Sequence, residues 1–153
     1  MKLTQTPGAV KRFRRTPWRF QQTVATPLED LDRFVATIAA AHGRIEEATV
    51  TIDQIVFTPN SLIALTSQLS PLSLTRESSI TAETPQEVEL LLKAALTDWT
   101  DFIFIPTPKP FVIYADHDEY ITFYANTKSQ LNHVIEPLES RGYKLVQNWQ
   151  REF

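Results

Sequence analysis

The fold is decided by residues 111–124, which read FVIYADHDEYITFY. Two apolar runs rich in β-branched and aromatic side chains, 111–115 and 120–124, flank four charged positions. Two such runs separated by a short polar turn predict a β-hairpin. The turn carries Asp116, His117, Asp118 and Glu119. Because charged groups lose hydration when they are buried, we expect this turn to point away from the core and to be available to a partner.

Further strands are predicted on both sides of the hairpin. Residues 102–105 form a short apolar run typical of a buried strand, and prolines follow it. Residues 18–24, 49–57 and 143–149 are also strand candidates. Two more strand candidates are ambiguous: residues 61–69, which fit a strand or a short helix, and residues 71–76. The hairpin is therefore expected to belong to a larger sheet.

Three helices are predicted from a repeated start signal, in which a threonine at the N-cap is followed three positions later by glutamate or glutamine. Thr26, Thr84 and Thr127 each begin such a signal. The first predicts a helix over residues 27–42, where apolar side chains recur at helical spacing. The second opens an apolar stripe that reaches Trp99.

The third helix is expected to begin after Thr127 and to end at Gly142. Pro137 lies within its apolar pattern. A proline in the middle of a helix costs roughly 3 kcal/mol. We therefore expect a kink or a restart at Glu136–Pro137.

The order of these elements predicts an α+β fold. Runs of neighbouring strands with few helices between them favour a mostly antiparallel sheet with helices on one face. We expect a single layer of about five to seven strands, with three helices packed mainly on one face. Residues 1–17 are interpreted as a basic N-terminal arm and residues 18–153 as a single α+β domain.

Composition excludes several classes of protein. The 153 residues suit one domain with a substantial core. The chain has no cysteine, which excludes disulfides and thiolate metal sites, and its three glycines are too few for a phosphate-cradling loop. The longest apolar runs are too short to cross a bilayer, and the N-terminus lacks the apolar segment of a secretory signal. We expect a cytoplasmic protein without membrane association and without a cofactor.

Charge is distributed unevenly along the chain. Six basic residues fall within the first 20, and no acidic residue precedes Glu29. The remaining residues have a net charge of −9. The basic segment interleaves cations with Phe13, Trp18 and Phe20, a mixture that nucleic-acid-binding proteins use. The candidate nucleic-acid-binding residues are Lys11, Arg12, Arg14, Arg15 and Arg19. A transit peptide, a solvated tail and docking on the acidic body are the other interpretations.

The charged turn has three interpretations. It is a polar hairpin turn, a weak oxygen-ligand site for a divalent cation, or a contact surface for a positively charged partner. We favour no metal site, because the spacing is not that of a calcium-binding loop. The candidate partner-binding residues are Tyr114, Asp116, His117, Asp118, Glu119 and Tyr120. The neighbouring acids are expected to favour the protonated form of His117.

Catalytic motifs are not evident. None of the serines has the flanking glycines of a nucleophile elbow, and His42, His117 and His133 are not spaced as zinc ligands. A pair of catalytic carboxylates is not singled out by any pattern. We predict no catalytic residues and a non-enzymatic protein. An unrecognised hydrolase or transferase is the third interpretation.

Residues 98–124 resemble small bacterial proteins that serve as immunity partners of polymorphic toxins. The resemblance rests on Asp98-Trp99, Asp101-Phe102, Pro106, Pro108, Pro110-Phe111 and the run from Tyr114 to Tyr120. It implies a single-domain protein that binds a toxin and blocks it. An acidic, aromatic-flanked hairpin suits a basic target, such as the cleft of a nuclease toxin. The alternative is a small nucleic-acid-associated or regulatory protein that uses the basic arm.

Overall fold

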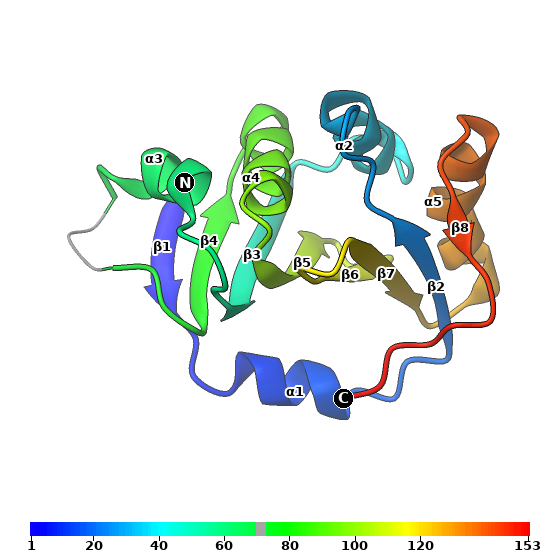
Figure 1. Cartoon of the computed structure of the whole chain (residues 1–153), viewed down its shortest axis with the longest axis horizontal. Helices are drawn as coiled ribbons and strands as arrows, with labels where there is room; N and C mark the ends of the chain where they lie inside the picture. The colour runs from blue at the N-terminus through cyan, green and yellow to red at the C-terminus, as the bar shows by residue number, and fades with distance from the viewer. Residues whose placement is uncertain (70–72) are drawn as a thin grey trace.

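The computed structural model describes residues 1–69 and 73–153. These residues form one antiparallel sheet of eight strands in the order β1-β4-β3-β5-β6-β7-β2-β8 (Figure 1). The strands are β1 (Lys2–Gln5), β2 (Phe20–Ala25), β3 (Glu47–Gln54), β4 (Ser78–Ala82), β5 (Asp101–Thr107), β6 (Val112–Ala115), β7 (Tyr120–Ala125) and β8 (Leu145–Val146). The α+β class and the antiparallel sheet are therefore confirmed.

Helices cover both faces of this sheet, but unequally. Figure 1 shows α2 and α4 above the sheet, α5 at the right beside β2, and α1 below the sheet. The helices are α1 (Ala9–Arg15), α2 (Leu31–Ala40), α3 (Asn60–Thr66), α4 (Pro85–Thr97) and α5 (Lys128–Ser140). The expected five to seven strands and three helices were too few, since the described residues form eight strands and five helices.

Alternation along the strands divides the core into two clusters. On β5, Phe102 and Phe104 belong to the large cluster beneath α2–α5, whereas Ile103 and Ile105 belong to a smaller cluster with Val10 and other residues. Successive strand residues point to opposite faces, so a strand covered on both sides is apolar throughout. We call the side that carries the smaller cluster the α1 face. It completes this cluster with Phe13, Trp18, Val112, Tyr114 and Tyr124.

The hairpin forms as the sequence predicts. β6 and β7 pair in antiparallel register from Val112 opposite Tyr124 to Ala115 opposite Ile121. Phe111 and Phe123 are fully buried in the large cluster. The charged residues 116–119 form the connection between the two strands.

Two of the three predicted helix starts are confirmed. The Thr84 hydroxyl accepts a hydrogen bond from the Glu87 amide at 3.2 Å, and the Thr127 hydroxyl accepts one from the Gln130 amide at 3.1 Å. The start at Thr26 is wrong, because α2 begins only at Leu31. The Thr26 amide instead donates to the Glu119 carbonyl at 2.8 Å, so this residue continues the line of β2 beside the hairpin turn.

The helix around Pro137 does not restart. α5 runs without interruption from Lys128 to Ser140, and its final turn is closed by backbone bonds from Gly142 to Glu139 and from Tyr143 to Leu138. Gly142 has a φ of 89°, a left-handed conformation that glycine adopts at little cost. The loss of one amide donor near the end of a capped helix is therefore tolerated.

The N-terminal segment belongs to the fold. Residues 1–17, expected as an arm, contribute β1 at one edge of the sheet and α1 on its second face. Residues 61–66 of the ambiguous segment 61–69 belong to α3, and β4 follows the ambiguous residues 71–76, of which 71 and 72 lie outside the described residues. Nowhere in the described chain is a helix long and apolar enough for a membrane crossing.

Candidate functional site

The charged turn is divided between residues that fold back and residues that project. The Asp116 carboxylate accepts the Asp118 amide at 2.8 Å, which closes the turn onto itself. Asp118 and Glu119 are exposed, with 74% of the Asp118 side chain accessible to solvent. Glu119 has a φ of 73°, a conformation uncommon for a residue with a side chain. The expectation that all three carboxylates point into water holds for two of them.

Asp116 forms an ion pair with Arg151 from the C-terminal end of the chain. The Arg151 Nη1 donates to Asp116 Oδ2 at 2.5 Å, and the side chains of Arg151 and Asp116 are only 9% and 10% exposed. The guanidinium also lies 4.7 Å from the centre of the Tyr114 ring, and its Nε donates to Thr122 Oγ1 at 3.3 Å. No local sequence pattern indicates this partner, because 35 residues separate Asp116 from Arg151.

His117 is held by a buried carboxylate. Its Nδ1 and its backbone amide each lie 2.8 Å from Asp101 Oδ1. The pKa of His117 is raised, chiefly by this hydrogen bond to Asp101. Partial burial opposes the rise in pKa, and the charges of Asp101, Asp118 and Asp116 add to it. The direction is the one expected from the acidic turn, but its main cause is a residue that the sequence did not single out.

The two tyrosines of the predicted site differ in exposure. Tyr114 is buried on the α1 face, and its hydroxyl donates to Asp53 Oδ2 at 2.5 Å. Burial, followed by this hydrogen bond, raises the pKa of Tyr114 far above that of a free tyrosine. Tyr120 is half-buried, with its ring centre 4.9 Å from that of Trp149. Tyr114, predicted as a partner-binding residue, is therefore not accessible to a partner in this structure.

Asp53 joins the N-terminal helix to the sheet. Its carboxylate accepts from Arg14 Nη2 at 3.0 Å and from Arg76 Nε at 3.3 Å, in addition to Tyr114. Asp53 is buried near the end of β3, so three donors compensate its lost hydration. Arg14, a candidate for nucleic-acid binding, thus has an intramolecular role. The Arg14–Asp53 contact therefore docks the basic segment on the body, which is one of the interpretations in the sequence analysis.

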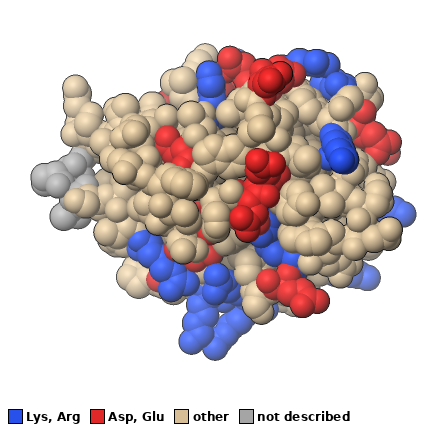
Figure 2. Space-filling model, in the orientation of Figure 1, with Lys and Arg blue, Asp and Glu red and all other residues tan. Residues whose placement is uncertain are grey.

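The other basic candidates remain on the surface. Lys11, Arg12, Arg15 and Arg19 are exposed. Basic side chains gather at the lower edge of the molecule in Figure 2, where Figure 1 places α1. Arg12 donates to the Pro7 carbonyl at 3.3 Å, and the Arg19 guanidinium lies 6.0 Å from the Phe20 ring centre. The structure places Lys11, Arg12 and Arg15 together on α1, whereas Arg19 lies in the connection between α1 and β2.

Residues 147–153, which we call the C-terminal segment, cross the α1 face. The predicted strand 143–149 is confirmed only over Leu145–Val146, and Asn148 has a φ of 57°. Beyond this point every second side chain turns toward the protein: Trp149 contacts Tyr120, Arg151 pairs with Asp116, and Phe153 packs on Phe13 and Tyr114. The alternation of Trp149, Arg151 and Phe153 with polar residues is the sequence signal that could have predicted this extended segment.

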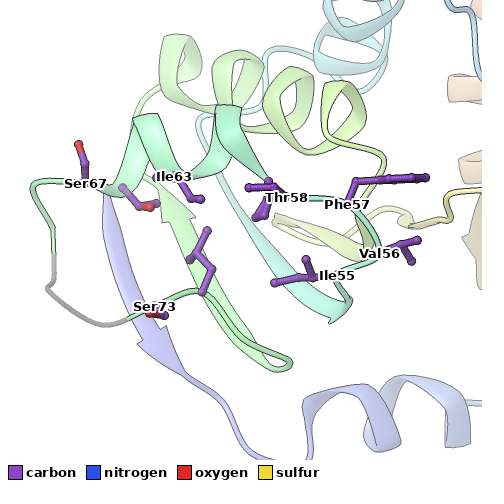
Figure 3. A pocket seen from close by; sticks show the side chains of 10 residues that line it. Ile55, Val56, Phe57, Thr58, Ile63, Ser67 and Ser73 are labelled. Atoms are coloured by element: carbon purple, nitrogen blue, oxygen red, sulfur yellow. The ribbon is translucent and has the colours of Figure 1, made fainter.

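An open pocket of about 620 Å³, lined by both apolar and hydroxyl side chains, lies elsewhere, between the end of β3 and α3 (Figure 3). Its wall includes Ile55, Val56, Phe57 and Ile63. Val56, Phe57 and Ile63 are large apolar side chains that remain exposed. The sequence analysis did not identify this pocket, because its walls come from a loop, a short helix and the segment before β4.

The buried carboxylates have structural partners. Asp98 accepts the Ser61 and Leu62 amides at 3.0 and 2.8 Å and so caps α3, whose own N-cap is a proline. Asp53 and Asp101 are engaged as described above. Within residues 1–69 and 73–153, no group of three or more histidines and carboxylates is placed to hold a metal ion.

Comparison with known proteins finds no matching family model, no similar curated protein and no similar solved structure. The fold and its site define an α+β protein with a single antiparallel sheet. Its candidate function is therefore argued from its own residues.

Proposed function

We propose that this chain is a non-enzymatic protein-binding module of the immunity type, which binds and blocks a bacterial toxin. The observation that carries the proposal is the pair of exposed carboxylates, Asp118 and Glu119, on a turn whose other residues are fixed. Asp116 is held by Arg151, and His117 is held by Asp101. A binding surface that is already ordered pays less conformational entropy on association.

The proposed partner is a basic protein surface. The whole chain has a net charge of −3, and the part outside its first 20 residues, which includes the turn, has a net charge of −9 that would accelerate encounter with a basic domain. The exposed carboxylates would then meet lysine or arginine side chains at the rim of the interface. Charges at a rim affect chiefly the association rate and its dependence on salt.

A protection experiment tests the proposed function. A toxin with a basic catalytic domain, taken from the neighbouring reading frame, is produced in bacteria with and without this chain. Co-production of the natural sequence is expected to restore growth, and the double variant Asp118→Ala, Glu119→Ala is expected to protect less at limiting expression. Glu136→Ala, Glu139→Ala removes two exposed carboxylates from α5 and is the matched control. Growth arrest despite the natural chain would reject the proposal.

A second candidate function is supported by α1. Lys11, Arg12 and Arg15 are exposed on this helix, and only Arg14 is paired with a described carboxylate. A small nucleic-acid-associated or regulatory protein would use this surface for phosphate contacts, which weaken as salt increases. Retention on heparin that is lost in Lys11→Ala, Arg12→Ala, Arg15→Ala would favour this function.

A further inference from the structure

The C-terminal segment is attached to the α1 face by side chains rather than by strand pairing. Its residues 147–153 belong to no strand. Its one described backbone bond to the sheet runs from the Arg151 amide to the Gln21 side chain, at 3.3 Å. Phe153 remains 56% exposed even though its ring contacts Phe13 and Tyr114. The Arg14 guanidinium lies 5.1 Å from the Phe153 ring centre and Trp149 packs on Tyr120, so Arg151 supplies the ion pair of an attachment that is otherwise aromatic.

The groups that receive Arg151 all belong to the β6–β7 hairpin. The Asp116 carboxylate accepts from Nη1, the Thr122 hydroxyl accepts from Nε, and the Tyr120 carbonyl lies 3.5 Å from Nη2. The Tyr114 ring lies under the guanidinium plane, 4.7 Å from its carbon. These four residues stand on β6, the turn and β7, so the receptor for the arginine is complete without the C-terminal segment.

This receptor is specific for arginine. A planar guanidinium donates from several nitrogens and stacks on an aromatic ring at the same time, whereas a lysine ammonium does neither in this geometry. Trp149 adds a second ring 5.2 Å from the guanidinium carbon. With an arginine in place the carboxylate is only 10% exposed, and charges that are shielded from water attract each other more strongly than charges in bulk water. The site therefore favours occupation by a cation.

We propose that the Asp116 pocket is an arginine-binding site for the partner protein, and that Arg151 occupies it as an internal, displaceable ligand. The inference rests on the proposed function, because the basic partner supplies the competing arginine. The side chains of the C-terminal segment define the preferred ligand as an arginine with an aromatic residue two positions before it and two positions after it. Displacement of the segment would uncover Tyr114, Asp116 and Tyr120 as one surface beside the exposed carboxylates.

Binding of a synthetic peptide tests this proposal without the toxin. The probe is a labelled peptide with the sequence of residues 147–153, blocked at both ends and titrated by fluorescence anisotropy. The protein is the full chain carrying Arg151→Ala, which vacates the pocket. We expect saturable binding to this variant and at least about tenfold weaker binding to the natural chain, whose tethered segment competes at an effective concentration on the order of millimolar.

Two controls identify the contact. A peptide with alanine in place of arginine, tested on the same Arg151→Ala protein, is expected to bind at least about tenfold more weakly, as expected for loss of a charged pair. Adding Asp116→Asn to Arg151→Ala should abolish binding of the natural peptide, whereas adding Glu136→Gln on α5 should leave it unchanged. Circular dichroism establishes that each variant is folded.

The outcomes separate this inference from the proposed function. The arginine-pocket proposal is overturned if the peptide shows no saturable binding to the Arg151→Ala protein, or if the arginine and alanine peptides bind with equal affinity. Either result would do so even if the toxin binds elsewhere on the chain. Peptide binding in a protein that fails to protect against the toxin would leave the arginine pocket intact and reject the immunity function.

Discussion

The carboxylate of Asp116 and the guanidinium of Arg151 form a nearly buried ion pair between the β6–β7 turn and the C-terminal segment. The pair neutralises one of the three acids that the sequence places on the turn. It also fixes the direction in which Asp118 and Glu119 project. The exposed charge of the turn is therefore smaller than the sequence indicates, but the two exposed carboxylates lie on an ordered turn.

Arg151→Ala is expected to lower the free energy of unfolding by about 1 kcal/mol, because release of the segment lets water reach Asp116. An ion pair enclosed in a core would cost about 3–5 kcal/mol when one partner is removed. Urea denaturation of the full chain measures the difference. A loss in the larger range would show that the C-terminal segment is an integral part of the core and would contradict a displaceable ligand.

The His117–Asp101 pair predicts a pH dependence of stability. Because the pKa of His117 is raised in the folded protein, its stabilisation is fully present below the unfolded pKa near 6.5 and is lost as pH rises through the folded pKa. The difference in unfolding free energy between the natural chain and His117→Ala should therefore be larger at pH 6 than at pH 9. Chemical denaturation at the two pH values measures it, and an equal difference would contradict the pairing.

Asp101→Asn should move the pKa of His117 downward, toward that of a free histidine, since Asp101 is the main cause of the rise. Asp118→Asn should lower it less, because Asp118 contributes only through its charge at 3.6 Å from Nε2. An NMR titration of the imidazole protons gives both values. A larger shift in the Asp118 variant would reverse this assignment of causes.

Tyr114→Phe removes a donor to the buried Asp53 carboxylate and leaves Arg14 and Arg76 in place. Hydrogen bonds to charged groups contribute about 1.5–3 kcal/mol, so we expect a loss of stability in that range. Tyr120→Phe is the control, with an expected change within about 0.5 kcal/mol. Similar denaturation midpoints for the two variants would show that the Asp53 cluster does not depend on Tyr114.

Two threonines with the same sequence signal provide a test of the helix starts. Thr84→Ala should cost about 1 kcal/mol of stability because the Thr84 hydroxyl caps α4. Thr26→Ala should cost less, since α2 begins five residues later and has Asp30 as its N-cap. Thermal unfolding compares them, and equal losses would mean that Thr26 has a capping role after all.

The parts of the fold that were predicted correctly depend on local chemistry. A few adjacent residues are enough to predict the β6–β7 hairpin, the helix caps at Thr84 and Thr127, and the end of α5 at Gly142. The predicted helix start at Thr26 is wrong because the Thr26 amide donates to the Glu119 carbonyl, a contact made across the sheet. The N-terminal helix was missed because its buried face in seven residues consists of Val10 and Phe13 alone, too short a pattern to recognise.

The site was less predictable than the fold, for a physical reason. Its turn is visible in the sequence, but its electrostatics are set by partners far along the chain. Asp53 lies 39 residues from Arg14 and 61 from Tyr114, and only the closed sheet brings them together. Neither the net charge nor a local sequence pattern shows that Asp116 is paired with Arg151. The positions of Asp118 and Glu119 could be predicted, because they follow from the turn itself.

The most direct test of the account is calorimetric titration of the basic toxin domain into the full chain and into Asp118→Ala, Glu119→Ala. Two exposed ion pairs of about 0.2–1 kcal/mol each predict a loss of affinity of about twofold to thirtyfold. The α5 variant Glu136→Ala, Glu139→Ala, with the same change in net charge, should bind like the natural chain. Equal affinity of the turn variant and the natural chain would contradict the claim that these two carboxylates contact the partner.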